Sequence, residues 1–426
     1  MESKASLRIT SIAIVTVLLG SLPSVSAVAG TSTSVSDEAS VQAMLGERSK
    51  AVSMKDRQGF MNTVDSSQSD FAQSQSRWFD GITALPITGY SLHLQLDRAP
   101  ELTRDKQRRA YKTKVLVADV EERFTITGYD QEPTNNDLIL TFVKRGASWK
   151  VASDSDTEDL GILTNRSLWE FGQVQTRQSQ HFMLLFHPDQ AKFAADLLDK
   201  AEAALPDVAK AWNRQWSQKV PVLVPSSDEE LKRLLGATFD VSNFVAFATA
   251  SLELDAADSP WKLVGRRIFL NRSNFISHSA SSRRSIFAHE LTHVAARSAS
   301  GPFIPTWVEE GLAQLSEGAT TDLFVSQVKA GRFSGQLPED WQFTTGTGTS
   351  IFLSYQASLS AMRYMRSRFG EEAPDRLYAE LGGPKFDVGT QTFHVDLAMQ
   401  KTFAESFDQF QSDWAADVKK QAGVSG

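Results

Sequence analysis

The strongest constraint in this 426-residue sequence is an apolar helical stretch that carries two histidines and a glutamate. Residues 286–295 read IFAHELTHVA, so apolar side chains cover most sides of the predicted helix. His289 and His293 are four positions apart, which on an α-helix is about 400° of rotation and about 6 Å of rise. Both imidazole side chains therefore project from the same face of the helix. Because a buried helix rarely carries such groups without partners, we expect the fold to give them one.

Two neutral imidazoles placed side by side can share one metal ion, and the HExxH pattern is typical of zinc hydrolases. Glu290 lies about 100° round the helix from His289, which suits a general base acting on water better than a ligand. A catalytic zinc usually takes three protein ligands and keeps one position open. The two histidines therefore require a third ligand from nearby.

The third ligand is expected on a second, returning helix. Gly301, Pro302 and Pro305 end the first helix, and residues 306–315 then read as a short helix. A helix, a tight turn and a returning helix bring Glu310 toward the histidines. Glu309 points about 100° away from that direction.

This second helix resembles a known motif. Residues 307–311 read WVEEG, similar to the WLNEG segment of the gluzincin metallopeptidases, in which the glutamate before the glycine binds zinc. The resemblance implies that His289, His293 and Glu310 hold one zinc ion per chain, and that Glu309 replaces the family's asparagine. Gln314 stands where related enzymes often place an acidic group that orients the first histidine. The neutral amide leaves that role open.

A further catalytic group is implied by the same resemblance. In several gluzincins a downstream tyrosine or histidine hydrogen-bonds the oxyanion of the tetrahedral intermediate, and the segment SYQASLSAMRYM resembles the corresponding helix. It nominates Tyr355, after a polar loop at residues 344–350. The alternative for Tyr355 is a structural role as a core tyrosine. In that case His394 or His278 is the candidate electrophile.

The N-terminus has the features of a secretory signal peptide over residues 1–29. Lys4 and Arg8 precede an apolar run, Ile12 to Leu19, and small residues follow through Ala29. The run is short for a membrane span, although an uncleaved anchor is the alternative. We therefore expect a secreted protein with no integral membrane span after cleavage. Because the sequence contains no cysteine, we expect neither a lipid attached through cysteine nor disulfide bonds.

After the signal peptide, residues 30–36 read as a flexible linker and residues 37–155 as an α+β domain. Helical stripes come first, strands follow, and residues 144–147 form a hairpin turn. The series resembles the cone-shaped domains of the nuclear transport factor 2 and cystatin-like group in KDRQGFMNTVD, ITGYD and FVKRGASWKVASD. His93 is the single histidine there and reads as an outward strand residue. We expect a non-catalytic accessory domain.

Residues 156–180 are expected to connect this domain to a zinc metallopeptidase-like domain at residues 181–426. Strands and the long helix Asp189–Trp216 are predicted before the HExxH helix, whose N-cap comes from the serines at 279–282. By the gluzincin resemblance this is a two-lobed α+β unit, and Arg266–Asn271 is the edge strand that holds an extended substrate.

The sequence therefore predicts a secreted zinc metallopeptidase acting on peptide or protein substrates. In this mechanism Glu290 takes a proton from water and delivers it to the leaving amine, while Tyr355 stabilises the oxyanion. A net charge of −7 argues against nucleic acid or an anionic membrane surface as the main partner. The alternatives are a secreted ligand- or cell-wall-binding protein with a structural or vestigial metal site, and a non-peptide amidohydrolase.

Overall fold

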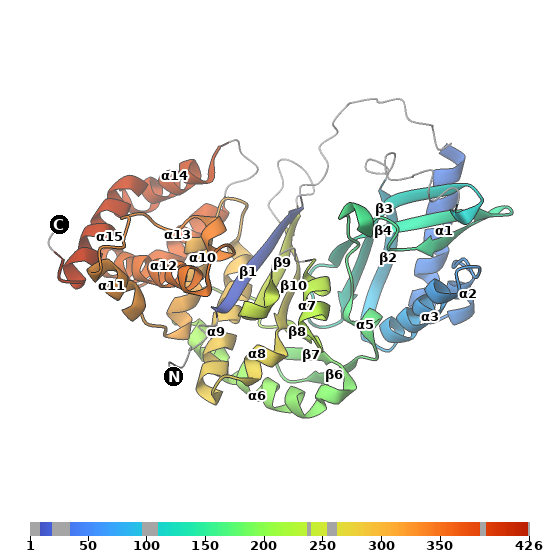
Figure 1. Cartoon of the computed structure of the whole chain (residues 1–426), viewed down its shortest axis with the longest axis horizontal. Coiled ribbons are helices and arrows are strands. Elements are labelled where there is room, and N and C mark those ends of the chain that lie inside the picture. The colour runs from blue at the N-terminus through green and yellow to red at the C-terminus, as the bar shows by residue number, and fades with distance from the viewer. Residues whose placement is uncertain are drawn as a thin grey trace.

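The computed structural model describes residues 9–18, 35–95, 110–236, 240–253, 262–383 and 389–424. It is an α+β protein, as predicted, with a four-stranded and a six-stranded sheet and a C-terminal group of helices (Figure 1). Within the described residues, no helix combines the length and apolar character needed to cross a membrane.

The first part of the chain places three helices before an antiparallel sheet of order β2-β3-β4-β5. Its elements are α1 (Val35–Met54), α2 (Arg57–Met61), α3 (Ser69–Thr83), β2 (Ile87–Gln95), β3 (Val115–Ile126), β4 (Thr134–Arg145) and β5 (Ser148–Ser153). The predicted order of helices then strands is confirmed. The hairpin between β4 and β5 turns at Gly146, whose φ of 61° favours glycine.

Apolar periodicity explains how these helices pack. On α1 the predicted stripe is buried, and on α3 Trp78 stacks on Phe60 of α2 at 5.3 Å between ring centroids. His93 is exposed on β2, as expected of an outward strand residue. The short helix α5 (Leu168–Phe171) then packs Trp169 edge-on against Phe124 of β3.

The six-stranded sheet has the order β1-β9-β10-β8-β7-β6. Its strands are β1 (Ile9–Leu18), β6 (Gln175–Gln178), β7 (Phe182–Phe186), β8 (Val220–Val224), β9 (Phe244–Glu253) and β10 (Lys262–Leu270). Strands β7, β8 and β10 run parallel, whereas β9 is antiparallel to β10 and parallel to β1. The fully buried residues of β7 and β8 are the apolar runs expected of central parallel strands.

Three predictions in this region need correction. Arg266–Asn271 is not an edge strand, because β10 pairs with β9 on one side and β8 on the other. The long helix stops early: α6 spans Ala191–Val208 and contains Pro206, which lacks a helical N–H. The connector contributes a strand, β6, which its polar and exposed side chains concealed.

The N-terminal predictions are only partly covered by the described residues. Residues 1–8 and 19–34, which include most of the expected signal peptide and most of the linker, lie outside them. Residues 9–18 form β1, which pairs with β9 on the side that faces the C-terminal helices (Figure 1).

One helix, α7, precedes β9 and β10, and the chain after β10 is mostly helical. The helices are α7 (Asp228–Leu235), α8 (Arg272–Ile276), α9 (Ala280–Ala296), α10 (Thr306–Glu317), α11 (Asp322–Lys329), α12 (Gly348–Phe369), α13 (Ala373–Gly382), α14 (Gln391–Phe403) and α15 (Phe407–Gln421). Helix α9 packs on β9 and β1, while α10 packs on α9 and α12. His394 lies on α14.

Candidate metal centre

Helix α9 is built to be buried. Its N-cap is Ser279, whose Oγ accepts a hydrogen bond from the Ser282 N–H at 3.2 Å. Every residue from Ile286 to Ala296 is buried, which agrees with the apolar surface on most sides of the helix. The polar groups of His289, Glu290 and His293 are therefore held inside the protein, at 0 to 2% exposure.

The turn after α9 depends on close backbone contacts. A Cβ on Gly301 would lie 3.1 Å from the backbone of Gly382 at the end of α13. Helix α10 then begins after Pro305 and returns along α9, where Thr292 donates a hydrogen bond to Ser316 Oγ at 2.7 Å. This clamp fixes the register of the two helices.

Gly311, in the WVEEG segment, lets α10 approach α12. A Cβ there would lie 2.7 Å from the Ser358 carbonyl oxygen and 2.7 Å from Met362 Cγ. Any side chain would therefore push α12 away. Because Tyr355 lies on the same helix as Ser358, this glycine also sets how close Tyr355 comes to α9 and α10.

The side chains of His289, His293 and Glu310 converge on one point. His289 Nε2 lies 3.1 Å from His293 Nε2 and 3.1 Å from Glu310 Oε2, and His293 Nε2 lies 3.4 Å from the same oxygen. Ligand atoms about 2.0–2.1 Å from a tetrahedral zinc ion are about 3.3 Å apart. The three atoms form a triangle of that size, and two imidazoles with a carboxylate are a donor set that zinc accepts.

The charges at this point are strongly coupled. Burial disfavours a charged imidazole, but hydrogen bonds to Glu310 and Glu317 outweigh it and raise the pKa of His289 to about 10. Burial lowers the pKa of His293 to about 4. Burial also acts against the Glu310 carboxylate, yet the two histidines hold its pKa well below the usual range. A cation at the centre of the triangle would balance the Glu310 charge in place of the His289 proton.

Glu317 is a functional candidate that the sequence reasoning missed. Its Oε2 lies 3.1 Å from His289 Nδ1 and accepts a hydrogen bond from Gln314 Nε2 at 2.9 Å. Gln314 therefore does not orient the histidine itself; it holds the carboxylate that does. With Nδ1–H donated to Glu317, the Nε2 lone pair of His289 is left for a cation. The spacing of Glu310, Gln314 and Glu317 on one helical face was the available signal.

Tyr355 lies beside this triangle, and Glu290 follows His289 on α9. The Tyr355 ring is 6.4 Å from the His289 ring between centroids and is 1% exposed. Burial, followed by the charges of Glu310, Glu290 and Glu317, raises the pKa of Tyr355 well above its ordinary value. The phenol therefore stays protonated and keeps its O–H as a donor.

The remaining sequence candidates lie away from the triangle. Glu309 accepts a hydrogen bond from the Tyr378 hydroxyl at 3.4 Å, and burial raises its pKa to about 7 against the opposing charge of Arg297. His394 stacks on Phe303 at 3.7 Å between ring centroids. Among the described residues, the group that could hold a metal ion is His289, His293 and Glu310, and it includes neither His394 nor His278.

Comparison with known proteins adds no relative: no protein-family model and no curated protein matches this chain.

Proposed function

We propose that the chain is a secreted, zinc-dependent peptidase of gluzincin type. The observation that carries the proposal is the triangle of His289, His293 and Glu310, with edges of 3.1, 3.1 and 3.4 Å. Glu290 supports it, because a second acidic group beside such a triangle is the general base that hydrolysis needs. Export rests on the signal-peptide features of residues 1–29.

When bound, zinc supplies Lewis acidity, which polarises a carbonyl group and lowers the pKa of water to about 7. His289, His293 and Glu310 would hold it. Glu290 accepts the proton of the attacking water and returns it to the leaving amine. Its complete burial keeps bulk water from competing for that proton.

Two further side chains serve the reaction without binding the metal. Tyr355 donates a hydrogen bond from its neutral phenol to the oxyanion that forms on the scissile carbonyl. Glu317 holds the His289 ring in the orientation and tautomer that a ligand requires. Gln314 fixes Glu317 in turn.

The strand proposed to pair with substrate is β9, because β10 has neighbours on both sides. β9 contacts α9, which carries the histidines, and its other neighbour is β1. Loss of residues 1–29 as a signal peptide would remove β1 and leave the outer side of β9 for an extended peptide. Backbone pairing there would present a peptide bond to Glu290 with little dependence on side chains.

The decisive experiment compares wild-type protein with Glu290→Gln on casein, a peptide library and a set of non-peptide amides. The variant keeps the size of the side chain and removes the base, so hydrolysis should fall by about 10²–10⁴-fold while zinc content is unchanged. The matched control is Glu371→Gln, which makes the same chemical change at a residue whose side chain is 84% exposed, and it should keep full activity. Hydrolysis that survives in Glu290→Gln would refute the assigned base, and activity on amides alone would replace peptidase by amidohydrolase.

One observation favours a second candidate, a binding protein with a structural metal. His289, Glu290 and Glu310 are each 0% exposed, and structural zinc sites are closed whereas catalytic ones keep an open position. This candidate predicts stoichiometric zinc, no hydrolysis of any substrate in the panel, and a loss of stability when zinc is removed.

A further inference from the structure

A cavity lies between the two sheets, at a place that the metal centre does not use. Its volume is about 230 Å³. It is lined by β3 and β4 of the four-stranded sheet, by β7 to β10 of the six-stranded sheet, and by α5 and α7. Among the described residues, no side chain of α9 or α10 lines it.

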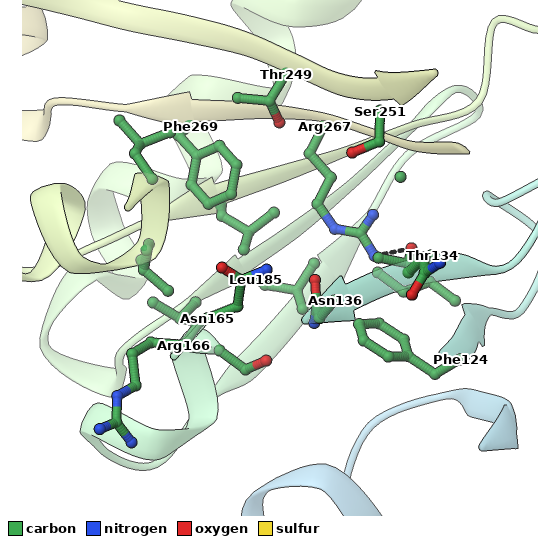
Figure 2. Close-up of a pocket in the computed structure, with 18 of the residues that line it drawn as sticks. Phe124, Thr134, Asn136, Asn165, Arg166, Leu185, Thr249, Ser251, Arg267 and Phe269 are labelled. Atoms are coloured by element: carbon green, nitrogen blue, oxygen red, sulfur yellow. Dashed lines mark hydrogen bonds between the residues drawn. The ribbon is translucent and has the colours of Figure 1, made fainter. Parts of the chain in front are cut away.

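Strand alternation explains which face of the six-stranded sheet the cavity meets. Gly265, Arg267 and Phe269 of β10 line it at every second position, and Thr249 and Ser251 of β9 line it together with Ala250 between them. Thr249 and Ser251 are only half-buried, whereas Val245 and Phe247 of the same strand are buried. Figure 2 shows Arg267 reaching from β10 to Thr134, with Asn136 and Phe124 on the side of the cavity opposite Thr249 and Ser251.

A bulge in β10 directs an arginine into this space. The register with β9 shifts between Val264 and Arg267, and Gly265 has a φ of 62°. Arg266, within the bulge, donates a hydrogen bond to Gln131 at 2.5 Å, and Arg267, directly after it, donates one to Thr134 at 2.6 Å. Both arginines therefore join the sheets, but only Arg267 lines the cavity.

The Arg267 guanidinium is not fully satisfied. Its side chain is 8% exposed, and Nη1 is buried with no hydrogen-bond partner in the part of the chain that the structure describes. Its charge is already countered, because Asp130 Oδ2 lies 3.6 Å from Nη2. A buried donor without an acceptor is costly, so the site calls for an acceptor but not for a second negative charge.

We propose that this cavity binds a small uncharged amide with an apolar or aromatic substituent. The amide oxygen accepts from Arg267 Nη1, and its N–H groups face the hydroxyls of Thr249 and Ser251 and the side chain of Asn136. The substituent packs on Phe269 and Leu185, which form the apolar part of the wall. Asn165, which is exposed, stands at the rim where a ligand enters.

The test is direct binding of benzamide, N-methylbenzamide and N-benzylacetamide to the full chain, measured by calorimetry, with benzoate and toluene as comparisons. Saturable binding of at least one amide is expected, tighter than for benzoate or toluene. Arg267→Met should weaken it about tenfold, since one hydrogen bond to a charged donor is lost. Thr249→Phe should abolish it by filling the cavity, and this variant keeps the Arg267 contacts if Arg267→Met does not fold.

Arg266→Gln is the matched control, because it changes the neighbouring arginine between the sheets without touching the cavity. It should bind the amide as the wild type does. The proposal is overturned if no amide in the set binds, which is the result for a cavity that holds only water. It is also overturned if binding is equal in wild type and Thr249→Phe. Since the readout is binding, neither result depends on the proposed peptidase activity.

Discussion

Two groups of buried charge in this molecule are arranged in opposite ways. In the first part of the chain, Arg48 donates to Thr63 at 2.9 Å and to Gln75, and its guanidinium lies 3.8 Å over the Phe60 ring. Nearby, Glu122 accepts from the Tyr90 hydroxyl and from Asn136, each at 2.9 Å. Each of these polar groups has its own hydrogen-bond partners among its neighbours.

In the candidate metal centre, by contrast, three groups point at one another's reactive atoms. His289 and His293 bring two ring nitrogens within 3.1 Å, and both face a single Glu310 oxygen. Each of the three groups has the other two within 3.4 Å, so all of their contacts fall in one small space. Separate pairing is typical of a structural network, whereas convergence of ligand atoms on a common point is typical of a cation site.

The largest effect on stability is expected at the paired network. Arg48→Met should lower the free energy of unfolding by about 3–5 kcal/mol, because it leaves Thr63 and Gln75 without their buried donor and removes the positive charge near Glu122. Zinc content should not change. Urea unfolding followed by fluorescence measures the loss, and Arg57→Met, which breaks an exposed pair with Asp80, should cost less than about 1 kcal/mol. Equal losses in the two variants would contradict the comparison.

In the candidate metal centre, a substitution should change zinc affinity and leave stability nearly unchanged. Glu317→Gln removes the carboxylate behind His289, so zinc affinity should fall about 10–100-fold with little change in unfolding of the zinc-free protein. Competition with a chromophoric chelator gives the affinity. Unchanged zinc binding would mean that Glu317 does not support His289.

A smaller effect with a defined pH dependence is expected at Asp65. Burial disfavours its charge, but hydrogen bonds from Arg145 and Ser67 outweigh burial and hold the pKa of Asp65 below its ordinary value. A lowered folded-state pKa contributes stability above the unfolded value, near 3.9, that is lost as pH falls through the folded value.

Asp65→Asn should therefore cost about 1.5 kcal/mol at pH 7, with the difference from wild type closing below pH 4. Thermal or urea unfolding at both pH values measures it. A difference that persists at low pH would show that the contact is not electrostatic.

The local geometry of the centre could be predicted from sequence because helix periodicity is rigid. The four-residue spacing places His289 beside His293, and the turn at Gly301 to Pro305 returns Glu310 to them. Glu317 was not predicted, although it lies two helical turns from Glu310 on the same face of α10. The proximity of Tyr355 followed from a resemblance, and its cause, the close approach at Gly311, is visible only in the packing.

Strand neighbours could not be predicted in the same way. The sequence indicates that Arg267 lies on a strand but not which strands lie beside it, and the edge position that the gluzincin resemblance implied is wrong, because β10 lies between β9 and β8. Strand β6 carries no apolar signal, because all four of its side chains are exposed. The cavity at Arg267 is lined by strands and helices that are far apart in the sequence, so no local sequence pattern predicts it.

The central claim, that the converging groups form a zinc site, is tested most directly by metal analysis of wild type, Glu310→Gln and Glu309→Gln. The two variants make the same chemical change at adjacent buried positions, but only Glu310 faces the histidines. One zinc per chain is predicted in wild type and Glu309→Gln, with loss of zinc from Glu310→Gln. Full zinc occupancy in Glu310→Gln, or no zinc in the wild type, would contradict the account.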